Sequence, residues 1–518
     1  MNHKKKYLLS ALLFITIGAY SQIPEDALRY SFYPQNASAR IMAVGGAMGS
    51  LGGDISANYV NPAGLGMYRT SELVFTPGYF LNNNSIDFRG TSTQNNKNSL
   101  GLGPTGFVFG FDDQGKPNTS HAFSIAISQT ANFNNTLRYS GYNNYSSYAE
   151  QWAEEFSKSN LSINDAINNP GFAFGTAPAL YTYLVDTITV NDTVRIKALP
   201  EFTLAQGNAL YQQNTVETKG GIYELAISFA TNKNDKFLFG GSLGIPILNY
   251  DNTTTFSETD TSSNHNNYFN HFTYTDAYSV SGVGFNVKLG AIYKPKEYIR
   301  LGLALHTPTY FTSLQESRRT SLATYKEGYA NNNDSVSSDL FTSGQPGLNK
   351  YNLLTPFKLI ASGSYVFRET ADITKQKAFI TADIEYVDYN IASFSTDNEA
   401  ALQDELDYFH QLNSVIRNQY KGTFNFRAGG ELKFNTIMGR LGFAYYGNPY
   451  KDAALKATRT LLSGGIGYRN NGFFIDLTYV YSINKDVNFP YRLEDKANTF
   501  STVDTKRGNI VATLGIKL

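Results

Sequence analysis

The stretch FFIDLTYVYSI, residues 473–483, alternates between two kinds of side chain. Every odd-numbered position in it is apolar or aromatic, whereas the even-numbered positions include Asp476, Thr478 and Ser482. Because successive side chains of a β-strand point to opposite faces of the sheet, this pattern predicts a strand with one apolar face and one mixed face. The same alternation recurs in four further stretches, 285–293, 380–386, 424–434 and 510–518.

The lengths of these segments and of the connections between them indicate a membrane barrel. The segments extend over about 10 to 15 residues, whereas strands of soluble β-sandwiches usually have about 5 or 6. About ten tilted residues let a barrel strand cross a bilayer. Short polar connections alternate with long ones, which cover roughly 140–219, 250–276, 313–350, 391–420 and 484–505, as in outer-membrane barrels. The sequence therefore predicts an all-β, transmembrane antiparallel barrel.

Counting the alternating segments gives about fourteen strands, an even number, as single-chain bacterial barrels have. An even number puts the N-terminal segment and the C-terminus at the rim with the short turns, which is the periplasmic rim. The expected strands cover 72–81, 99–111, 120–139, 220–231, 236–249, 277–294, 298–312, 351–367, 376–391, 421–434, 440–448, 457–469, 472–484 and 506–518.

Two of the long loops show helical spacing of apolar residues. One covers 147–157 and the other 398–416, and each places its apolar side chains along one face of a helix. These faces either pack against the barrel rim or form a hydrophobic capture surface outside the cell. The residues concerned are Tyr148, Trp152 and Phe156 in the first loop, and Leu402, Leu406, Phe409 and Ile416 in the second.

The first residues have the layout of a secretory signal peptide. Three lysines at 4–6 precede a short apolar run at 7–19, and Ala19 and Ser21 supply small residues before a cleavage point ahead of Gln22. The apolar run is too short to cross a membrane as a helix. We therefore expect residues 1–21 to be removed on export and the rest to reach the outer membrane of a Gram-negative bacterium.

The composition narrows the range of functions. The formal net charge is +0, so the basic surface of a nucleic-acid-binding protein is not expected. Without cysteine the chain has no disulfide, no thiolate metal site and no thiol nucleophile. Five histidines follow the leader, at 121, 265, 271, 306 and 410, and none has the spacing of metal ligands. The sequence predicts neither a metal nor a cofactor.

Residues 22–70 do not alternate, and they are rich in glycine and alanine. Such a segment can fold compactly and approach other backbone closely. Its order, S-A-R followed by G-G-A and then D-x-S-A-x-x-x-N-P-A-G-L, resembles the N-terminal hatch of the FadL family of outer-membrane channels. The matching positions are Gly45, Gly46, Asp54, Ser56, Ala57, Asn61, Pro62, Ala63 and Gly64.

The resemblance implies a barrel of residues 71–518 plugged from within by a hatch of residues 22–70. It also implies passive uptake of hydrophobic molecules, long-chain fatty acids among them, which pass from the lumen into the outer-membrane lipid through an opening in the wall. Such an opening needs a break in strand pairing, for which Pro77-Gly78, Pro104 and Pro246 are candidates. The chain departs from many family members in ending on Leu518 instead of an aromatic residue.

A different class of function stays open at this point. Some FadL-like barrels act in type IX secretion, so the chain could instead be a structural component that docks protein partners through its large loops. An aromatic lumen would favour transport, whereas loops that form a stable complex would favour docking.

Two glycine-containing motifs look catalytic but do not have the context that catalysis needs. Residues 240–244 match G-x-S-x-G, yet apolar alternation continues through them, whereas a nucleophile elbow requires a sharp strand-to-helix turn. Residues 101–106 match G-x-G-x-x-G, but no helix pattern follows as nucleotide binding requires. We therefore expect no catalytic residues and no enzyme activity.

Several charged residues alternate with apolar ones and should face the lumen. They are Asp383 and Glu385 on one predicted strand, and Arg427, Glu431 and Lys433 on the next. Buried charges need partners, so we expect these five to form a network. The network either holds the barrel and the hatch together or binds the carboxylate of a ligand.

Overall fold

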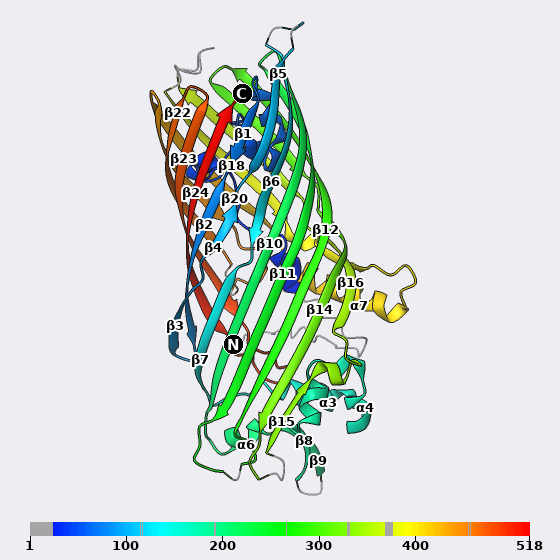
Figure 1. Ribbon diagram of the computed structural model, residues 1–518. Coiled ribbons are helices and arrows are strands. Elements are labelled where there is room, and N and C mark those ends of the chain that lie inside the picture. Colours follow the sequence, from blue (N-terminus) through cyan, green and yellow to red (C-terminus); the bar gives the residue numbers. More distant parts are fainter. Residues whose placement is uncertain are drawn as a thin grey trace, which may run out of the picture.

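The computed structural model describes residues 24–518, apart from 114, 117, 191–192, 266, 329–331, 368–376, 454 and 456. The expected signal peptide lies outside the described residues. The wall strands form one closed, fourteen-stranded antiparallel barrel (Figure 1), and β24 closes it by pairing with β1 and β2. This confirms the predicted fold class and strand number.

Several wall strands consist of consecutive segments separated by short breaks. In order around the barrel, the fourteen are β1 (Glu72–Phe75) with β2 (Pro77–Phe88); β3 (Thr91–Asn96) with β4 (Ser99–Leu102) and β5 (Thr105–Asp112); β6 (Ser120–Asn132) with β7 (Asn135–Asn143); β10 (Leu210–Lys233); β11 (Phe237–Asp260); β12 (His271–Lys296); β13 (Ile299–His306) with β14 (Tyr310–Tyr325); β16 (Gly347–Leu354) with β17 (Lys358–Phe367); β18 (Ala378–Asp388) with β19 (Ser393–Thr396); β20 (Gly422–Phe434); β21 (Ile437–Tyr446); β22 (Arg459–Asn470); β23 (Phe473–Asn488); and β24 (Ser501–Lys517).

The remaining elements lie inside the barrel or at its long-loop end. Among the described residues, no helix is both long and apolar enough to cross a membrane. The helices are α1 (Pro24–Arg29), α2 (Ala39–Ala43), α3 (Glu150–Ser159), α4 (Ile163–Ile167), α5 (Thr176–Tyr181), α6 (Pro200–Ala205) and α7 (Gln403–Gln419), with short 3-10 turns η1 (Ile55–Tyr59), η2 (Pro62–Met67), η3 (Pro170–Phe172), η4 (Ser338–Leu340) and η6 (Tyr389–Ile391); β8 (Val185–Val190) pairs with β9 (Thr193–Ala198), and β15 (Asn333–Ser337) pairs with β14.

An apolar band surrounds the barrel next to the rim with the short turns. On β13, Leu301, Leu303 and Leu305 are 49%, 55% and 42% exposed, whereas Arg300 and His306 on the opposite face are buried. A continuous apolar surface of this kind is stable against hydrocarbon and not against water. The band therefore marks the part of the wall that lies in the membrane, and the short-turn rim is the periplasmic one.

The wall strands extend much further beyond the membrane than the sequence pattern predicts. The structure places 251–260 in β11, 271–276 in β12 and 313–325 in β14, where we expected loops. The outward residues there are mostly serine and threonine, so the lipid-facing pattern stops although the strands continue. Inward-facing aromatic residues such as Phe256 and Phe272 are fully buried, and they hold the extension together.

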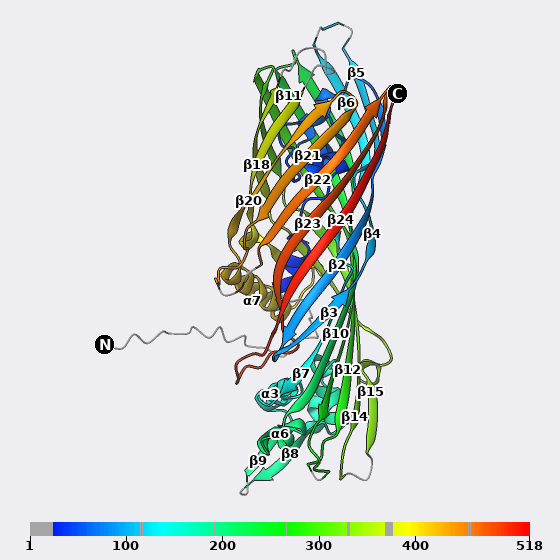
Figure 2. The same ribbon diagram turned by 90° about the vertical axis from the view of Figure 1, so that its left-hand side faces the viewer.

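The extended strands carry a folded extracellular unit, residues 144–209, which we call the cap. Figures 1 and 2 show its helices α3 to α6 and the β8–β9 hairpin together at the end of the molecule opposite the C-terminus. Trp152 and Phe156 of α3 pack with Phe256, Phe272 and Tyr274 of the sheet in one buried cluster. The first predicted loop helix thus packs against the extended wall.

The second predicted loop helix, α7, differs from expectation in which face it buries. Phe409, Leu412 and Ile416 are buried, but Leu402 is 76% and Leu406 is 37% exposed. The predicted stripe therefore began one turn too early, because α7 starts at Gln403 and Leu402 precedes its first turn.

Candidate functional site

Residues 24–70 run through the inside of the barrel (Figure 1) and contact strands from opposite sides of it. The backbone N–H of Ala39 donates to Thr513 Oγ1 at 2.8 Å, and the hydroxyl of Thr478 donates to the Ala39 carbonyl at 2.6 Å. Across the lumen, the Tyr59 hydroxyl donates to the Glu224 carbonyl at 3.1 Å. His306 Nε2 lies 2.8 Å from the Val60 carbonyl oxygen, so this N-terminal segment is surrounded by the wall.

Inward-facing glycines of the wall let the backbone of the N-terminal segment approach very closely. A Cβ atom on Gly302 would lie 2.1 Å from the Gly49 carbonyl oxygen. A Cβ atom on Gly442 would lie 2.1 Å from the backbone nitrogen of Gly45. No larger side chain fits at either place, so the segment is seated directly against wall backbone.

The motif residues of the N-terminal segment fix its internal shape. Asp54 caps η1 by accepting from the Ser56 N–H at 2.9 Å, and Asn61 caps η2 by accepting from the Ala63 N–H at 3.1 Å. Pro62 occupies the first position of η2, where a missing N–H costs nothing.

The glycines and the side-chain NH2 group of Asn61 also help to fix the shape of the N-terminal segment. Gly45 and Gly46 have φ of +74° and +79°, which only glycine adopts readily, and Gly64 lies against the Cα of Gly52. The Asn61 amide also donates to the Gly49 carbonyl at 2.6 Å.

Four of the five predicted lumen charges fall into two separate groups instead of one network, and Lys433 lies apart from both. Arg427 lies 3.1 Å from Glu385 and 3.9 Å from Asp383. Glu431 instead lies 2.6 Å from Arg440. Arg440 also pairs with Asp476.

Asp383 contacts the N-terminal segment as well as Arg427. Its carboxylate accepts from the backbone N–H groups of Met48 and Gly49 at 2.9 and 3.1 Å. The first charge group therefore ties the wall to the N-terminal segment. Lys433 lies near the end of β20, where its backbone N–H donates to the Lys377 carbonyl.

A small polar cavity of about 80 Å³ lies beside the N-terminal segment, on its extracellular side. Three cations line it, Lys288, Lys358 and Arg427, against two carboxylates, Glu224 and Glu385. Lys288 pairs with Glu224, and Arg427 pairs with Glu385.

Lys358 is the cation left over in this cavity. Its Nζ lies 5.2 Å from the centre of the Tyr33 ring, and within the described part of the chain it forms no ion pair. Asp383, 3.9 Å from Arg427, brings the carboxylates at and beside the cavity to three, so Lys358 is distinguished by its lack of an ion pair and not by a surplus of charge. Lys358 was not among the predicted lumen charges; it is the first residue of β17 and follows Thr355-Pro356-Phe357.

The wall contains a seam at which two neighbouring strands do not form a ladder. β5 pairs with β6 from Thr105 to Asp112, but beyond that point β6 and β7 pair with β10 alone. Throughout the seam the described residues of β3 and β4 form no ladder with β6 or β7. Pro104, one of the predicted break positions, lies where the ladder ends.

The other two predicted positions behave differently. Pro77 follows the break between β1 and β2, and Pro246 lies within the continuous strand β11.

Asparagine side chains bridge the seam in place of the missing ladder. Asn95 Nδ2 donates to the Arg138 carbonyl at 2.8 Å, and Asn132 Nδ2 donates to Ser99 Oγ at 3.2 Å. Asn84 Nδ2 donates to the Thr136 carbonyl at 2.9 Å. The N-terminal segment contributes as well, because Asn36 bonds to both sides of the seam. The clustering of asparagine at 93–98 and 132–135 is the signal that could have located the seam.

Neither catalytic motif forms a site. Ser242 of the G-x-S-x-G match lies in the middle of β11, buried and in extended backbone. The G-x-G-x-x-G match lies across the break between β4 and β5, with no helix after it. Among the described residues, no three histidine, aspartate or glutamate side chains are grouped closely enough to hold a metal ion.

Comparison with known proteins supports the architecture at the level of structure. No protein-family model matches the sequence, and no curated protein matches it. The crystal structure of a Pseudomonas aeruginosa FadL homologue is 14% identical, covers 93% of this chain and 99% of its own, and superposes with a TM-score of 0.53. A deltaS2 mutant of the monoaromatic hydrocarbon channel TodX is 13% identical, covers 94% and 100%, and gives 0.50. The chain therefore has the fold of the FadL-type transmembrane barrels.

Proposed function

We propose that this protein is an outer-membrane channel for passive uptake of hydrophobic molecules with an anionic head group, long-chain fatty acids in particular. The observation that carries the proposal is Lys358, the cation without an ion-pair partner in the lumen cavity. Lys358 is half-buried, and a charge withdrawn from water is costly unless a counter-charge accompanies it. A ligand carboxylate supplies that counter-charge.

The size of the cavity fits a head group and not a whole fatty acid. A volume of about 80 Å³ equals the space of roughly two or three water molecules. The alkyl chain needs an apolar neighbour, and aromatic side chains supply one on the extracellular side of the cavity. Tyr30, Phe133 and Tyr250 form an edge-to-face cluster there, with centroids 5.4 to 6.0 Å apart. Each methylene transferred from water to such a site contributes ~0.8 kcal/mol.

The N-terminal segment acts as the hatch in this proposal. Its backbone is seated against wall glycines and tied by Asp383, Thr478 and Thr513. Such a seat blocks the straight route from the lumen to the periplasm. We therefore propose that residues 38–67 stay in place during transport.

The seam between β3–β4 and β6–β7 is the proposed exit. Side-chain hydrogen bonds hold it, and these can break without disrupting a ladder. A hydrophobic ligand that leaves sideways enters lipid and never meets bulk water. The missing ladder beyond Pro104 supports this location. The ligand would then enter the lipid of the outer membrane.

Binding of oleate to the purified barrel tests the role of Lys358. Lys358→Gln should weaken oleate binding at least tenfold, Lys358→Arg should restore most of it, and Lys485→Gln should have no effect. Lys485 is a suitable control because it is 63% exposed and pairs with Asp504 outside the lumen. Toluene, which has no charge, should bind equally to all variants. Unchanged oleate binding by Lys358→Gln would refute the head-group proposal.

A second candidate function, docking of a protein partner, is favoured by the cap. The cap has its own buried aromatic core, which a transport pore does not require. Native mass spectrometry of the detergent-purified barrel separates the two. A co-purifying fatty acid that is lost in Lys358→Gln supports transport, whereas an empty lumen with a stoichiometric protein partner supports docking.

A further inference from the structure

The loop between β23 and β24 crosses from one side of the seam to the other. We propose that residues 488–498, which we call the strap, hold the seam closed from the extracellular side. The inference rests on the proposed function only in treating the seam as an exit. That the strap crosses the seam follows from the strand order and the contacts of the strap.

The order of strands around the wall defines the crossing. β23 pairs with β24, β24 with β2, and β2 with β3 and β4. The seam follows, and beyond it β7 pairs with β10. The strap starts and ends on the β23–β24 side, where Arg492 pairs with Glu25 of the N-terminal segment, yet it also contacts the cap, which follows β7 directly. Two strands and the seam therefore lie between the ends of the strap and its anchorage.

Two buried side chains anchor the strap in the cap. Tyr491 and Leu493 are each 4% exposed and belong to the aromatic core of the cap. The Tyr491 hydroxyl donates to the Ser146 carbonyl at 3.1 Å and accepts from Asn143 Nδ2 and Gln212 Nε2 at 3.0 and 3.1 Å. These partners come from the end of β7, from the β7–α3 connection and from β10, all on the far side of the seam.

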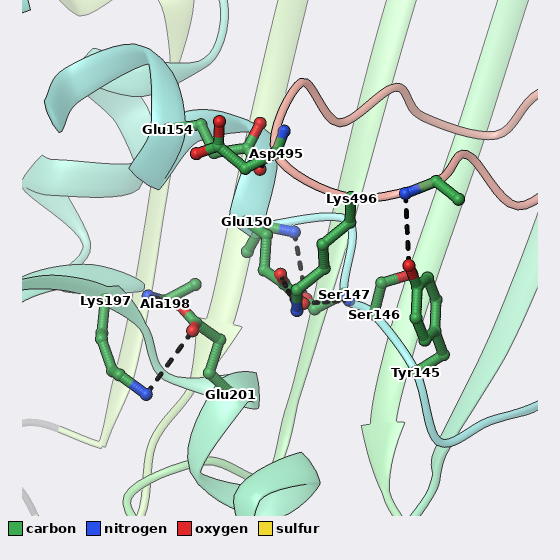
Figure 3. Close-up of polar contacts among 12 residues, drawn as sticks. Tyr145, Ser146, Ser147, Glu150, Glu154, Lys197, Ala198, Glu201, Asp495 and Lys496 are labelled. Atoms are coloured by element: carbon green, nitrogen blue, oxygen red, sulfur yellow. Dashed lines mark hydrogen bonds and ion pairs between the residues drawn. The ribbon is translucent and has the colours of Figure 1, made fainter. Parts of the chain in front are cut away.

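Ion pairs and backbone hydrogen bonds add a second row of contacts along α3, part of which Figure 3 shows. Lys496 lies 2.5 Å from Glu150 at the start of α3. Lys158 at its end lies 2.6 Å from Glu494 and 3.2 Å from Asp495.

Backbone groups of the strap join the same row. The carboxylate of Glu154 accepts from the backbone N–H groups of Glu494 and Asp495 at 2.8 and 3.3 Å. The Tyr145 hydroxyl accepts from the Ala497 N–H at 3.2 Å, so the strap lies along the whole length of α3.

A further contact, which we call the tie, joins the two sides of the seam at the start of the strap, on the lumen side. The Tyr139 hydroxyl of β7 donates to Asn488 Oδ1 at 2.7 Å. The Tyr139 ring packs on Phe88 of β2, with centroids 5.0 Å apart. The strap and this tie together hold the two sides of the seam in contact, as backbone hydrogen bonds do elsewhere in the wall. The Lys158 pairs are exposed, and such ion pairs are individually weak and screened by salt, so this part of the closure can be released.

A distance measurement across the seam, made without ligand, tests the strap. The chain has no cysteine, so spin labels go only to Gln94→Cys on β3 and Arg138→Cys on β7, both exposed positions. Reversing the charges with Lys158→Glu and Lys496→Glu should shift the distance distribution outward by about one strand spacing, roughly 5 Å. Lys485→Glu is the matched control, because that lysine lies on the same hairpin but pairs with Asp504 beside it.

A second variant removes the buried anchor without changing charge. Tyr491→Phe leaves Asn143 and Gln212 without the shared hydroxyl and should broaden the distribution, while heat-modifiable gel mobility confirms a folded barrel. Distances that are unchanged in both strap variants, or changed equally by Lys485→Glu, would overturn the proposal. Because the measurement includes no ligand, unchanged oleate binding by Lys358→Gln together with an intact strap effect would refute the proposed function alone.

Discussion

The side-chain amide of Asn36 donates to the carbonyl of Leu102 at 3.0 Å and to the carbonyl of Gln129 at 2.8 Å. One residue of the N-terminal segment thus joins the two strands that the wall leaves unpaired. Its neighbour Gln35 faces the lumen cavity, where its backbone N–H donates to the Tyr446 hydroxyl at 2.9 Å and its side chain accepts from Arg427 at 3.2 Å. Adjacent residues therefore connect the ligand cavity with the seam.

Replacing Asn36 with alanine should loosen the seam. The change removes the Asn36 donor from two partly buried carbonyls, which costs about 1–2 kcal/mol and raises the population of the locally opened seam roughly tenfold. Hydrogen exchange of residues 99–103 and 128–132 measures that opening. Asn98→Ala is the control, because Asn98 is exposed on the same connection. Equal exchange in both variants would show that Asn36 does not hold the seam.

Fixing the N-terminal segment to the wall should leave transport intact. Ser50 Oγ lies 2.8 Å from Ser362 Oγ, so Ser50→Cys with Ser362→Cys places two thiols in contact in a chain without other cysteines. If residues 38–67 stay seated, oleate uptake by cells is the same with the disulfide formed or reduced. Uptake that is lost on oxidation and recovered with reductant would instead show that the hatch moves.

A methyl group on the seating surface should destabilise the protein. In Gly302→Ala the new Cβ would lie 2.1 Å from the Gly49 carbonyl, so either the wall or the hatch must shift, at a cost of about 1–3 kcal/mol. Gly363→Ala on neighbouring β17 is the matched control, since nothing lies within 4 Å of its added Cβ. Thermal unfolding in detergent should show a lower melting temperature for the first variant only.

The sequence predicts the membrane-spanning strands, whose pattern repeats, but not the extracellular ends of the strands, where the pattern stops. Lipid-facing alternation on β20, β23 and β24 locates strands because each outward position meets the same apolar solvent. Above the membrane the outward positions of β11 and β12 meet water, so serine and threonine replace the apolar residues and the strand ends cannot be located.

The candidate site was harder to predict than the wall, since it depends on contacts between distant residues. Arg427 was recognisable as a partner of Asp383 and Glu385 because the neighbouring strands place it directly opposite Asp383 and diagonal to Glu385. Lys358 and Asn36 have no such local signal. Their roles follow from the cavity and the seam, which exist only once the barrel has closed.

The stability of the cap should depend on pH through Glu258, which lies beyond the membrane on β11. Burial raises the pKa of its carboxyl from 4.5 to about 7, although hydrogen bonds from Ser147, the Tyr148 N–H and Gln212 act in the opposite direction. The carboxylate of Glu150 raises this pKa further, and Lys496 in turn pairs with Glu150. Between pH 4.5 and 7 the folded cap therefore holds a proton that the unfolded cap has lost.

The sign of the effect follows from this difference in protonation. The stabilisation from the proton is complete below pH 4.5 and is lost as pH rises through 7, by an amount on the order of 3 kcal/mol. Limited proteolysis of residues 144–209 should thus be slower at pH 5 than at pH 8. Glu258→Gln, whose amide is neutral at both values, should remove a large part of the difference, and the rest is expected from Glu150 and Glu155 of α3, because burial raises the pKa of both carboxyls as well. A pH dependence that persists undiminished in Glu258→Gln would assign it to another group, and Glu150→Gln would then identify whether the strap's own ion pair is that group.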